Sequence, residues 1–212
     1  MPGRESPAVS KTVTGARGQR SSLERPHQKA AAWTQISPSS MLLKFAGKIS
    51  ASGEALTLDV ACGLGRNAVA LAAHGYDVVC LDRDLSKLRQ LGISEKSLLH
   101  TAPLTREPGS IIAVCAAVSR DVWPFPAESF DAIISVHFVM AELFSRFSVS
   151  LRRKGYLYIE TFGGQGRNFL DLPEPGQIRA GLDGLFTIIY YREKIVGPLR
   201  NAVTVKAFVR KL

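Results

Sequence analysis

Short runs of apolar residues alternate with stretches of helical spacing over most of the chain. Five of these runs lack regular polar alternation, which is typical of parallel strands that are buried on both faces. The runs are Leu56 to Ala61, Val78 to Leu81, Ile111 to Val118, Ala132 to Val136 and Tyr156 to Phe162. The pattern therefore predicts an α/β fold built on a mainly parallel sheet.

Helical spacing fills most of the gaps between these runs. Ser37 and Ser39 are possible N-caps of a first helix that reaches Ile49, within a segment that begins at Trp33. Apolar residues then recur at helical spacing after the first and second strands and over residues 138–151. This βαβ alternation predicts a doubly wound sheet with right-handed crossovers. Residues 92–110 have little periodicity, and the pattern does not place a helix there.

The C-terminal part follows a different pattern. Leu185 to Arg192 and Ala202 to Val209 are strand-like, and a short segment with Gly197 and Pro198 separates them. This connection is too short for a parallel crossover helix, so we expect the two strands to pair antiparallel. A mainly parallel sheet that ends in an antiparallel hairpin differs from a plain dinucleotide-binding fold.

Composition indicates one globular domain with a basic extension. The 212 residues are 46% apolar and 21% charged, which is close to average globular usage. Residues 1–32 hold six of the basic side chains against two acidic ones, so they contribute almost half of the net charge of +9. We interpret residues 1–32 as a solvated, disordered tail and residues 33–212 as the domain. No apolar run is long enough for a membrane helix, so we expect a cytoplasmic protein without a membrane partner.

The cysteines do not indicate a metal site. Cys62, Cys80 and Cys115 are widely spaced, each lies in an apolar stretch, and none forms a CxxC pattern. We expect three buried, reduced thiols and no metal.

A glycine-rich turn follows the first predicted strand. Gly63 and Gly65 allow a tight turn and a close approach of the backbone to a ligand. The segment G63-L-G-R-N-A68 fits the nucleotide fingerprint, and by itself it fits NAD(P) as well as S-adenosylmethionine (SAM). Asp59, four positions before Gly63, favours the cationic SAM over a pyrophosphate.

Further polar residues follow the other strands at the same predicted sheet edge. Asp82 ends the second strand, nineteen residues after Gly63, where a carboxylate can accept hydrogen bonds from both ribose hydroxyls. Asp121 is a candidate acceptor for an adenine amino group, with Val122 and Trp123 over the ring, although Trp123 could instead be a core aromatic residue. The fourth strand runs out at Ser135 to His137. Arg83 is a further candidate for a cofactor contact, but Arg83 and Asp84 could equally be a solvated residue and a helix N-cap.

These segments together resemble a known family. LDVACGLGRNAVALAAHGYDVVCLDRD, WPFPAESFDAIIS and LRRKGYLYIETFGGQGRNFLDLPEPGQIR resemble the class I methyltransferases grouped with the bacterial tellurite-resistance methyltransferases. The resemblance runs from about Trp33 to the C-terminus and implies a seven-stranded, Rossmann-like sheet, SAM as methyl donor and a small acceptor. It implies that Asp59, Gly63 and Gly65 hold the methionine end, Asp82 the ribose and Asp121 the adenine. The segment VSRDVWPF departs from the more acidic stretch expected of the family. The full set of expected cofactor contacts is Asp59, Ala61, Cys62, Gly63, Gly65, Asn67, Asp82, Arg83, Asp121, Val122, Ser135 and Val136.

Three residues are candidates for the chemistry on the acceptor. Methyl transfer from a sulfonium is an in-line displacement, so the protein mainly supplies orientation and a dry pocket. His137 and Glu160 are candidate bases if the acceptor must lose a proton, although either could instead be structural. The loop from Gly163 to Asn168 is expected to act as a lid, with Arg167 meeting an anionic acceptor.

The sequence leaves other functions open. The acceptor could be a metalloid oxyanion or another small metabolite. The basic tail also fits an RNA methyltransferase, but no aromatic and basic target-recognition insertion is evident, so a nucleic-acid partner is disfavoured. A SAM-binding regulatory protein without turnover is a further alternative, and an NAD-dependent oxidoreductase ranks last. The sequence does not indicate an oligomeric state.

Overall fold

The computed structural model describes residues 37–50, 55–91, 107–164, 166 and 168–212. Seven strands form one sheet in the order β3-β2-β1-β4-β5-β7-β6. The strands are β1 Leu56–Val60, β2 Asp77–Asp82, β3 Ile111–Cys115, β4 Phe130–Val136, β5 Leu151–Glu160, β6 Phe186–Val196 and β7 Ala202–Lys211. Strands β1 to β5 pair in parallel, whereas β7 pairs antiparallel with both β5 and β6. The predicted seven-stranded sheet with its C-terminal antiparallel hairpin is confirmed.

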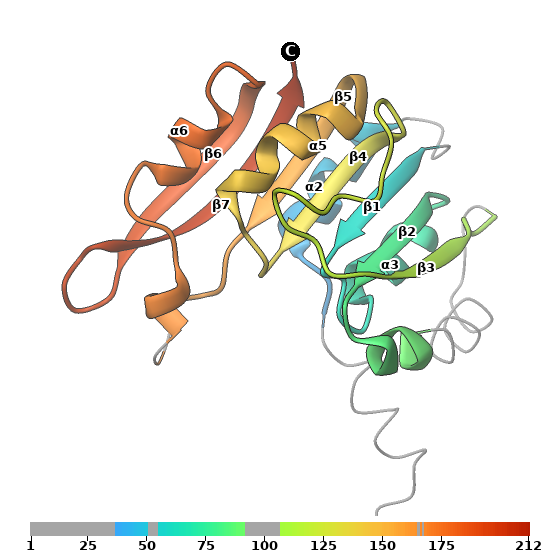
Figure 1. The fold of residues 1–212 in the computed structure, drawn as a ribbon, viewed down its shortest axis with the longest axis horizontal. Helices are drawn as coiled ribbons and strands as arrows, with labels where there is room; N and C mark the ends of the chain where they lie inside the picture. Colours follow the sequence, from blue (N-terminus) through green and yellow to red (C-terminus); the bar gives the residue numbers. More distant parts are fainter. Residues whose placement is uncertain (1–36, 51–54, 92–106, 165, 167) are drawn as a thin grey trace, which may run out of the picture.

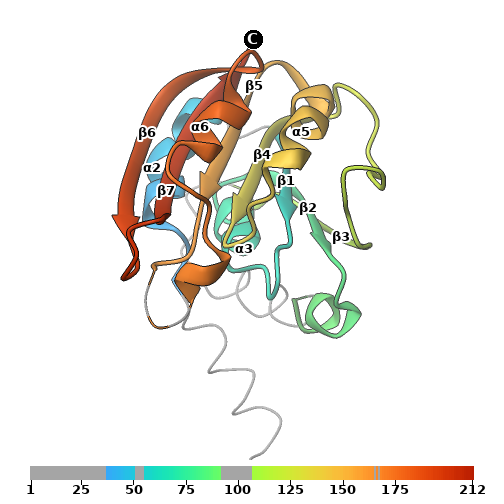
Figure 2. The ribbon, with the colours of Figure 1, turned by 60° about the vertical axis from the view of Figure 1, so that its left-hand side comes forward.

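Helices cover both faces of the sheet (Figures 1 and 2). The helical elements are α2 Ser40–Ile49, α3 Arg66–Ala72, η1 Ala141–Leu143, α5 Phe144–Ser150, η2 Asn168–Asp171 and α6 Gln177–Leu182, and residues 85–91 are also helical. Two apolar clusters match the two layers. One joins α5 and α6 to the sheet, and the other joins α2, α3 and residues 85–91 to the opposite face. This is the layered packing that buries both faces of a parallel sheet.

The strand order reverses between β1 and β4. Strand β1 continues to β2 on one side, whereas β4 lies on its other side and leads on to β5. In doubly wound sheets, the ligand crevice lies outside the carboxyl ends of the strands at such a point. The glycine turn after β1 and the segment after β4 therefore lie next to each other at the edge where a ligand is expected.

Strand β3 differs from the sequence prediction. It ends at Cys115 instead of Val118, and Ile112 in its middle is 54% exposed. The prediction that this run is buried on both faces is wrong, because β3 is an edge strand of the sheet. Cys115 is exposed as a result, whereas Cys62 and Cys80 are buried as expected.

The connection from β4 to β5 also differs. The helix expected over residues 138–151 is a 3-10 turn at 141–143 followed by α5, and β5 begins at Leu151 instead of Tyr156. Residues 152–154 are charged, and the register between β4 and β5 shifts in this region. Helix α6 was not predicted, and β6 extends to Val196 instead of Arg192.

Ser39 is the N-cap of α2, and its Oγ accepts from the backbone N–H of Leu42 at 3.2 Å. Of the two serines considered, Ser39 and not Ser37 has this role. The predicted tail at 1–32 and most of the irregular segment at 92–110 lie outside the described residues. Within the described part of the chain, no helix is long and apolar enough to cross a membrane.

Candidate functional site

The glycine turn uses conformations that favour glycine. Gly63 and Gly65 have φ values of +60° and +72°. A Cβ on Gly65 would collide with the side chain of Leu91, so this glycine permits close packing of the turn against the helix at residues 85–91. A Cβ on Gly63 would meet no atom within 4 Å, so the backbone of Gly63 borders open space. Ala61 also has a positive φ of 54°, which is unusual for a residue with a Cβ. Strain of this kind is typical of functional turns.

Asp59 lies beneath this turn instead of within it. Its side chain is only 1% exposed, and the backbone N–H of Ala68, in the first turn of α3, donates to its carboxyl. Burial raises the pKa of Asp59 to about 7, and the nearby Arg66 only partly offsets this effect. Its Oδ2 has no hydrogen-bond partner among the described residues. A positive charge nearby would stabilise the ionised form of this buried carboxyl, which has an unpaired oxygen directly behind the turn. The site therefore fits a cationic ligand.

Asp82 links the ends of β1 and β2. Its Oδ2 accepts from the backbone N–H of Gly63 at 2.8 Å, and its Oδ1 accepts from that of Asp84 at 2.9 Å. Each carboxylate oxygen has a second acceptor position, so hydroxyl groups of a ligand could still bind there. Arg83 is exposed, and Asp84 accepts from the backbone of Ser86, which is the N-cap arrangement considered for Asp84 from sequence.

The loop that contains Asp121 lies between β3 and β4. Asp121 and Val122 are both exposed, with Val122 at 56%. Trp123 instead packs against Phe147, and its indole N–H donates to Ser150 Oγ at 2.8 Å. Trp123 is therefore the core aromatic residue that the sequence allowed, and the adenine contact of Asp121 stays a prediction.

The remaining expected contacts surround the strand ends. Ser135 is buried and its hydroxyl donates to the carbonyl of Phe138, which closes the turn after β4. Val136 is buried in the α2 and α3 layer. Cys62 donates its backbone N–H to Leu81 at 3.0 Å, and Asn67 Oδ1 accepts from the backbone of Ser39 at 2.9 Å. Most of these groups already have hydrogen-bond partners within the protein.

His137 directly follows β4 and has a positive φ of 64°. Partial burial, together with the nearby Arg66, lowers the pKa of His137 below its ordinary value, so the ring is neutral at pH 7. Arg66 Nη2 lies 3.4 Å from His137 Nδ1. Because a guanidinium can only donate, Nδ1 is the acceptor and Nε2 carries the hydrogen. The ring also stacks on Phe162, with centroids 4.9 Å apart.

Glu160 ends β5 within a dense polar network. Its Oε2 accepts from Ser39 Oγ at 2.5 Å and from Tyr158 Oη at 2.6 Å, and Lys206 Nζ lies 2.8 Å from its Oε1. Burial alone would raise its pKa, but the bonds from Lys206, Ser39 and Tyr158 hold the pKa of Glu160 below its usual range. A carboxylate with three donors and a low pKa is a weak base. The geometry therefore favours the anchoring role for Glu160 over proton removal.

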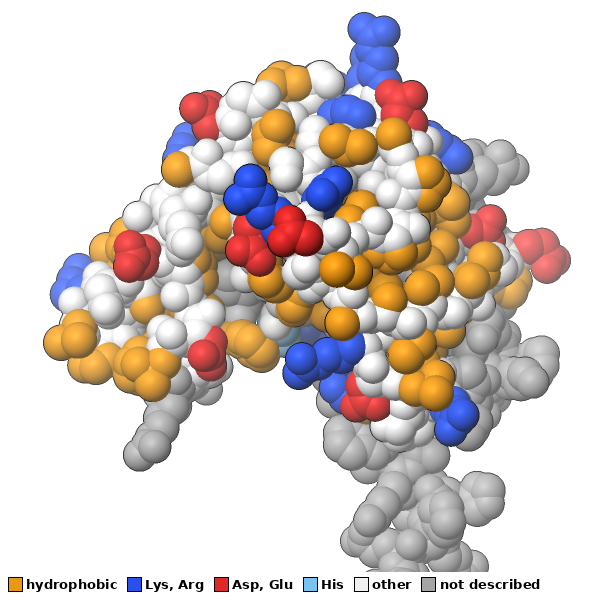
Figure 3. Space-filling view, in the orientation of Figure 1, with side chains coloured by type: hydrophobic (Ala, Val, Ile, Leu, Met, Phe, Trp, Pro, Cys, Tyr) orange, Lys and Arg blue, Asp and Glu red, His pale blue; other side chains and the backbone are white. Residues whose placement is uncertain are grey.

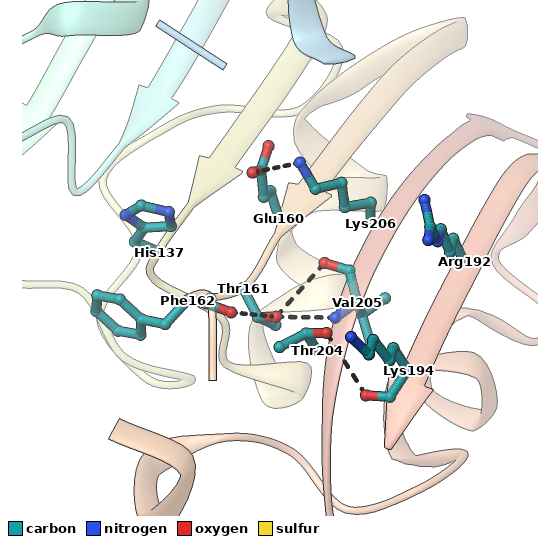
Figure 4. A pocket seen from close by; sticks show the side chains of 10 residues that line it. His137, Glu160, Thr161, Phe162, Arg192, Lys194, Thr204, Val205 and Lys206 are labelled. Atoms are coloured by element: carbon teal, nitrogen blue, oxygen red, sulfur yellow. Dashed lines mark hydrogen bonds and ion pairs between the residues drawn. The ribbon is translucent and has the colours of Figure 1, made fainter. Parts of the chain in front are cut away.

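A pocket of about 430 Å³ lies beside these residues, between the ends of β4 and β5 and the β6–β7 hairpin. Its lining residues are His137, Glu160, Thr161, Phe162, Gly163, Arg192, Lys194, Thr204, Val205 and Lys206. Figure 3 shows the surface hollowed between the hairpin and the rest of the molecule, and Figure 4 shows His137 and Phe162 on one side of the pocket with Arg192 and Lys194 on the other.

Sequence reasoning selected His137 and Glu160, which line this pocket, but missed the contribution of the hairpin. Arg192 and Lys206 lie in segments predicted only as strands, and Lys194 lies two residues beyond the first of these segments. The two-residue spacing of Arg192 and Lys194 was the available signal, because residues two apart on a strand lie on one face. Arg167 lies outside the described residues. Within the described ranges, no group of three or more His, Cys, Asp or Glu side chains is arranged to hold a metal ion.

Residues 58–159 match the family model of a methyltransferase domain. No curated protein matches the sequence. The matched residues run from β1 through β5 and so include the glycine turn, Asp82 and His137, but they exclude the hairpin.

Solved structures share the fold at low sequence identity. A SAM-dependent methyltransferase from Methanosarcina mazei has a TM-score of 0.60 and 16% identity, with 84% of this chain and 99% of that chain covered. TehB from Haemophilus influenzae has a TM-score of 0.58 and 17% identity, with 81% of this chain and 62% of that chain covered. The [4+2]-cyclase SpnF is also similar, with a TM-score of 0.55, 13% identity and coverage of 81% and 80%. The shared architecture is thus the class I methyltransferase fold, and it hosts more than one reaction.

Proposed function

We propose that this enzyme methylates a small molecule bound in the pocket between His137 and the β6–β7 hairpin. The chain carries a methyltransferase domain and uses SAM as its methyl donor. The observation that carries the proposal is the contact between the glycine turn and this pocket. Arg66, the first residue of α3, follows Gly65 directly and reaches His137 at the pocket rim. Cofactor and acceptor would therefore meet at one edge of the sheet.

Bound SAM would supply an electrophilic methyl group: a lone pair of the methyl acceptor would form the new bond to carbon while the carbon–sulfur bond breaks, and the sulfur would keep that electron pair as S-adenosylhomocysteine leaves. The residues proposed to hold SAM are Gly63 and Asp82, with Asp59 behind the turn. Gly63 offers open backbone, and Asp82 has acceptor positions left for ribose hydroxyls. Asp59 does not touch the ligand in this proposal, because its carboxyl is buried; its ionised form, which a nearby cation favours, acts on the positive charges of SAM across the turn.

His137 would orient the acceptor. With Arg66 donating toward Nδ1, the neutral ring offers an Nε2 hydrogen instead of a free lone pair. His137 thus donates a hydrogen bond to an atom of the methyl acceptor. A methyl acceptor that enters the pocket already deprotonated needs no base. Phe162, 40% exposed and stacked on His137, helps to exclude water from the reacting atoms.

The cofactor site is tested with a matched pair of glycine variants. Gly63 and Gly184 both have positive φ, at +60° and +68°, and a Cβ at either would meet no atom within 4 Å. Gly63→Ala and Gly184→Ala therefore impose similar backbone strain, of about 1 kcal/mol. We expect calorimetry to show SAM affinity reduced about tenfold or more in Gly63→Ala and unchanged in Gly184→Ala. Equal affinities in the two variants would contradict the proposed cofactor site.

Turnover needs a separate measurement. The purified protein is incubated with SAM and a panel of small acceptors that includes thiols, amines, carboxylates and metalloid oxyanions, and S-adenosylhomocysteine is quantified. Formation of this product with at least one acceptor supports the proposal. Binding of SAM without product from any acceptor would favour a SAM-binding regulatory protein instead.

A further inference from the structure

We propose that the pocket selects acceptors that carry a negatively charged oxygen group, and that Arg192 and Lys194 on β6 bind that group. This inference rests on the proposed function, since it names the chemical class of its acceptor. It concerns residues on a hairpin that lies outside the matched methyltransferase domain.

The register of the hairpin brings several cations to one face. Arg192 pairs with Lys206, and Lys194 pairs with Thr204, in the antiparallel ladder between β6 and β7. Residues two apart on a strand share a face, so the Arg192, Lys194, Thr204 and Lys206 side chains all project to the same side. All four line the pocket. Like charges directly opposite each other destabilise a sheet, so this arrangement needs a compensating negative charge.

Protein groups supply only part of that compensation. Lys206 forms an ion pair with Glu160, whose carboxylate is already shared with Ser39 and Tyr158. The described part of the chain provides no ion pair for Arg192 or Lys194. His137 cannot compensate these charges, because its ring is either neutral or positively charged. The pocket therefore has an excess of two positive charges on its β6 side.

The neighbouring acid on β6 does not balance these charges. Glu193 lies between Arg192 and Lys194 in sequence, so its side chain projects from the opposite face. There its carboxylate accepts from Tyr191 Oη at 2.6 Å and from the backbone N–H of Gly176 at 3.2 Å. A strand that places its acid on one face and two unpaired cations on the other is suited to bind an anion on the second face.

The shape of the site favours a small ligand over a macromolecular surface. The cations line a concave pocket of about 430 Å³, which is the size range of small-molecule sites. The segment after β5 packs closely on the hairpin, since a Cβ on Gly164 would lie 3.0 Å from Thr204 Cγ2 and 3.1 Å from Val196. Across the pocket from Arg192 and Lys194 lies the stacked pair His137 and Phe162 (Figure 4). An acceptor with an apolar part and an anionic end fits this division, with its charge toward β6 and its body against the rings.

The test uses calorimetry on the full chain with three probes that share an aromatic ring: phenyl phosphate, benzoate and neutral benzyl alcohol. We expect the wild type to bind the two anions and to bind benzyl alcohol at least about tenfold more weakly. The double variant Arg192→Gln with Lys194→Gln should lose about tenfold or more in affinity for both anions. Higher salt should weaken the wild-type binding in the same direction, because the cations are exposed.

A control double variant carries the same charge change elsewhere on the sheet. Arg153 on β5 and Arg210 on β7 are exposed and do not line the pocket. Arg153→Gln with Arg210→Gln should keep wild-type affinity for phenyl phosphate, and circular dichroism should show both double variants folded. Equal binding of phenyl phosphate by the wild type and the pocket variant, or equal loss in both double variants, would overturn the inference. SAM is titrated into the same samples, so failure of the proposed function appears as lost SAM binding and is distinguished from failure of the anion site.

Discussion

Replacement of Asp59 by asparagine should remove a pH dependence from the stability of the fold. The carboxyl is buried, and burial raises its pKa from 3.8 to about 7. The fold therefore favours the protonated acid, and the stabilising effect is full below the unfolded-state pKa and is lost as pH rises through the folded-state pKa. An asparagine has the shape of the protonated acid but does not titrate, so the variant should not show this loss.

The magnitude follows from proton linkage. Between the unfolded and folded pKa values, the free energy of unfolding falls by about 1.4 kcal/mol for each pH unit. From about pH 5 to about pH 8, the wild type should therefore lose about 3 kcal/mol relative to Asp59→Asn, almost all of it below pH 7. For a domain of this size, that difference corresponds to roughly 8 °C in Tm.

The assay is urea unfolding followed by circular dichroism at several pH values, with the slope against pH compared between proteins. The slope is the useful quantity, because a constant packing difference between Asp59 and asparagine cancels from it. Asp77→Asn is the control: its hydrogen bonds from Ser110 lower the pKa of Asp77, so this exposed acid stays charged throughout the range. Parallel slopes for the wild type and Asp59→Asn would refute the reasoning and show that the carboxyl is better solvated than the fold indicates.

Three further outcomes can be measured. Gly65→Ala should lower the free energy of unfolding by about 2 kcal/mol or more, because its Cβ would collide with Leu91 and φ is positive; urea unfolding with unchanged stability would show that the turn yields freely. The pKa of the His137 ring should lie below 6.5 in an NMR titration and rise in Arg66→Gln, since the nearby cation opposes protonation; a pKa above 6.5 in the wild type would contradict the effect assigned to burial and Arg66. Ser39→Ala should cost about 1–2 kcal/mol, because the variant loses both the cap of α2 and the hydrogen bond to Glu160, and thermal melts that coincide with those of the wild type would contradict this role.

The buried centre of the sheet could be predicted from sequence, whereas its edges could not. Strands β1, β2 and β4 are covered on both sides, so their apolar runs are continuous and their type is evident. Strand β3 lies at the sheet edge, so how far its side chains are exposed depends on its position in the sheet and not on its composition. The first half of β5 carries the polar, exposed residues 152–154. It therefore lacks the apolar run from which a buried strand is predicted.

The site divides in a similar way. Gly63 and Asp82 could be selected because strand ends in a parallel sheet meet at one edge, and their hydrogen bond joins two such ends. The charged face of the hairpin depends on a pairing between β6 and β7 that spacing alone does not specify, so Arg192 and Lys194 were not recognised. The burial of Asp59 is also a tertiary effect, since α3 covers the carboxyl.

The way α2 is anchored has a practical consequence for handling the protein. Arg66 donates to the carbonyl of Ser37 at 2.8 Å while it also reaches His137, so the chain that precedes α2 joins the domain at the rim of the pocket. The other terminus lies at the opposite end of the strands, where Lys211 Nζ donates to the carbonyl of Leu151 (Figure 1). An affinity tag or immobilisation linker at the C-terminus would therefore leave the pocket clear, and ligand measurements are best made with the protein attached from that side.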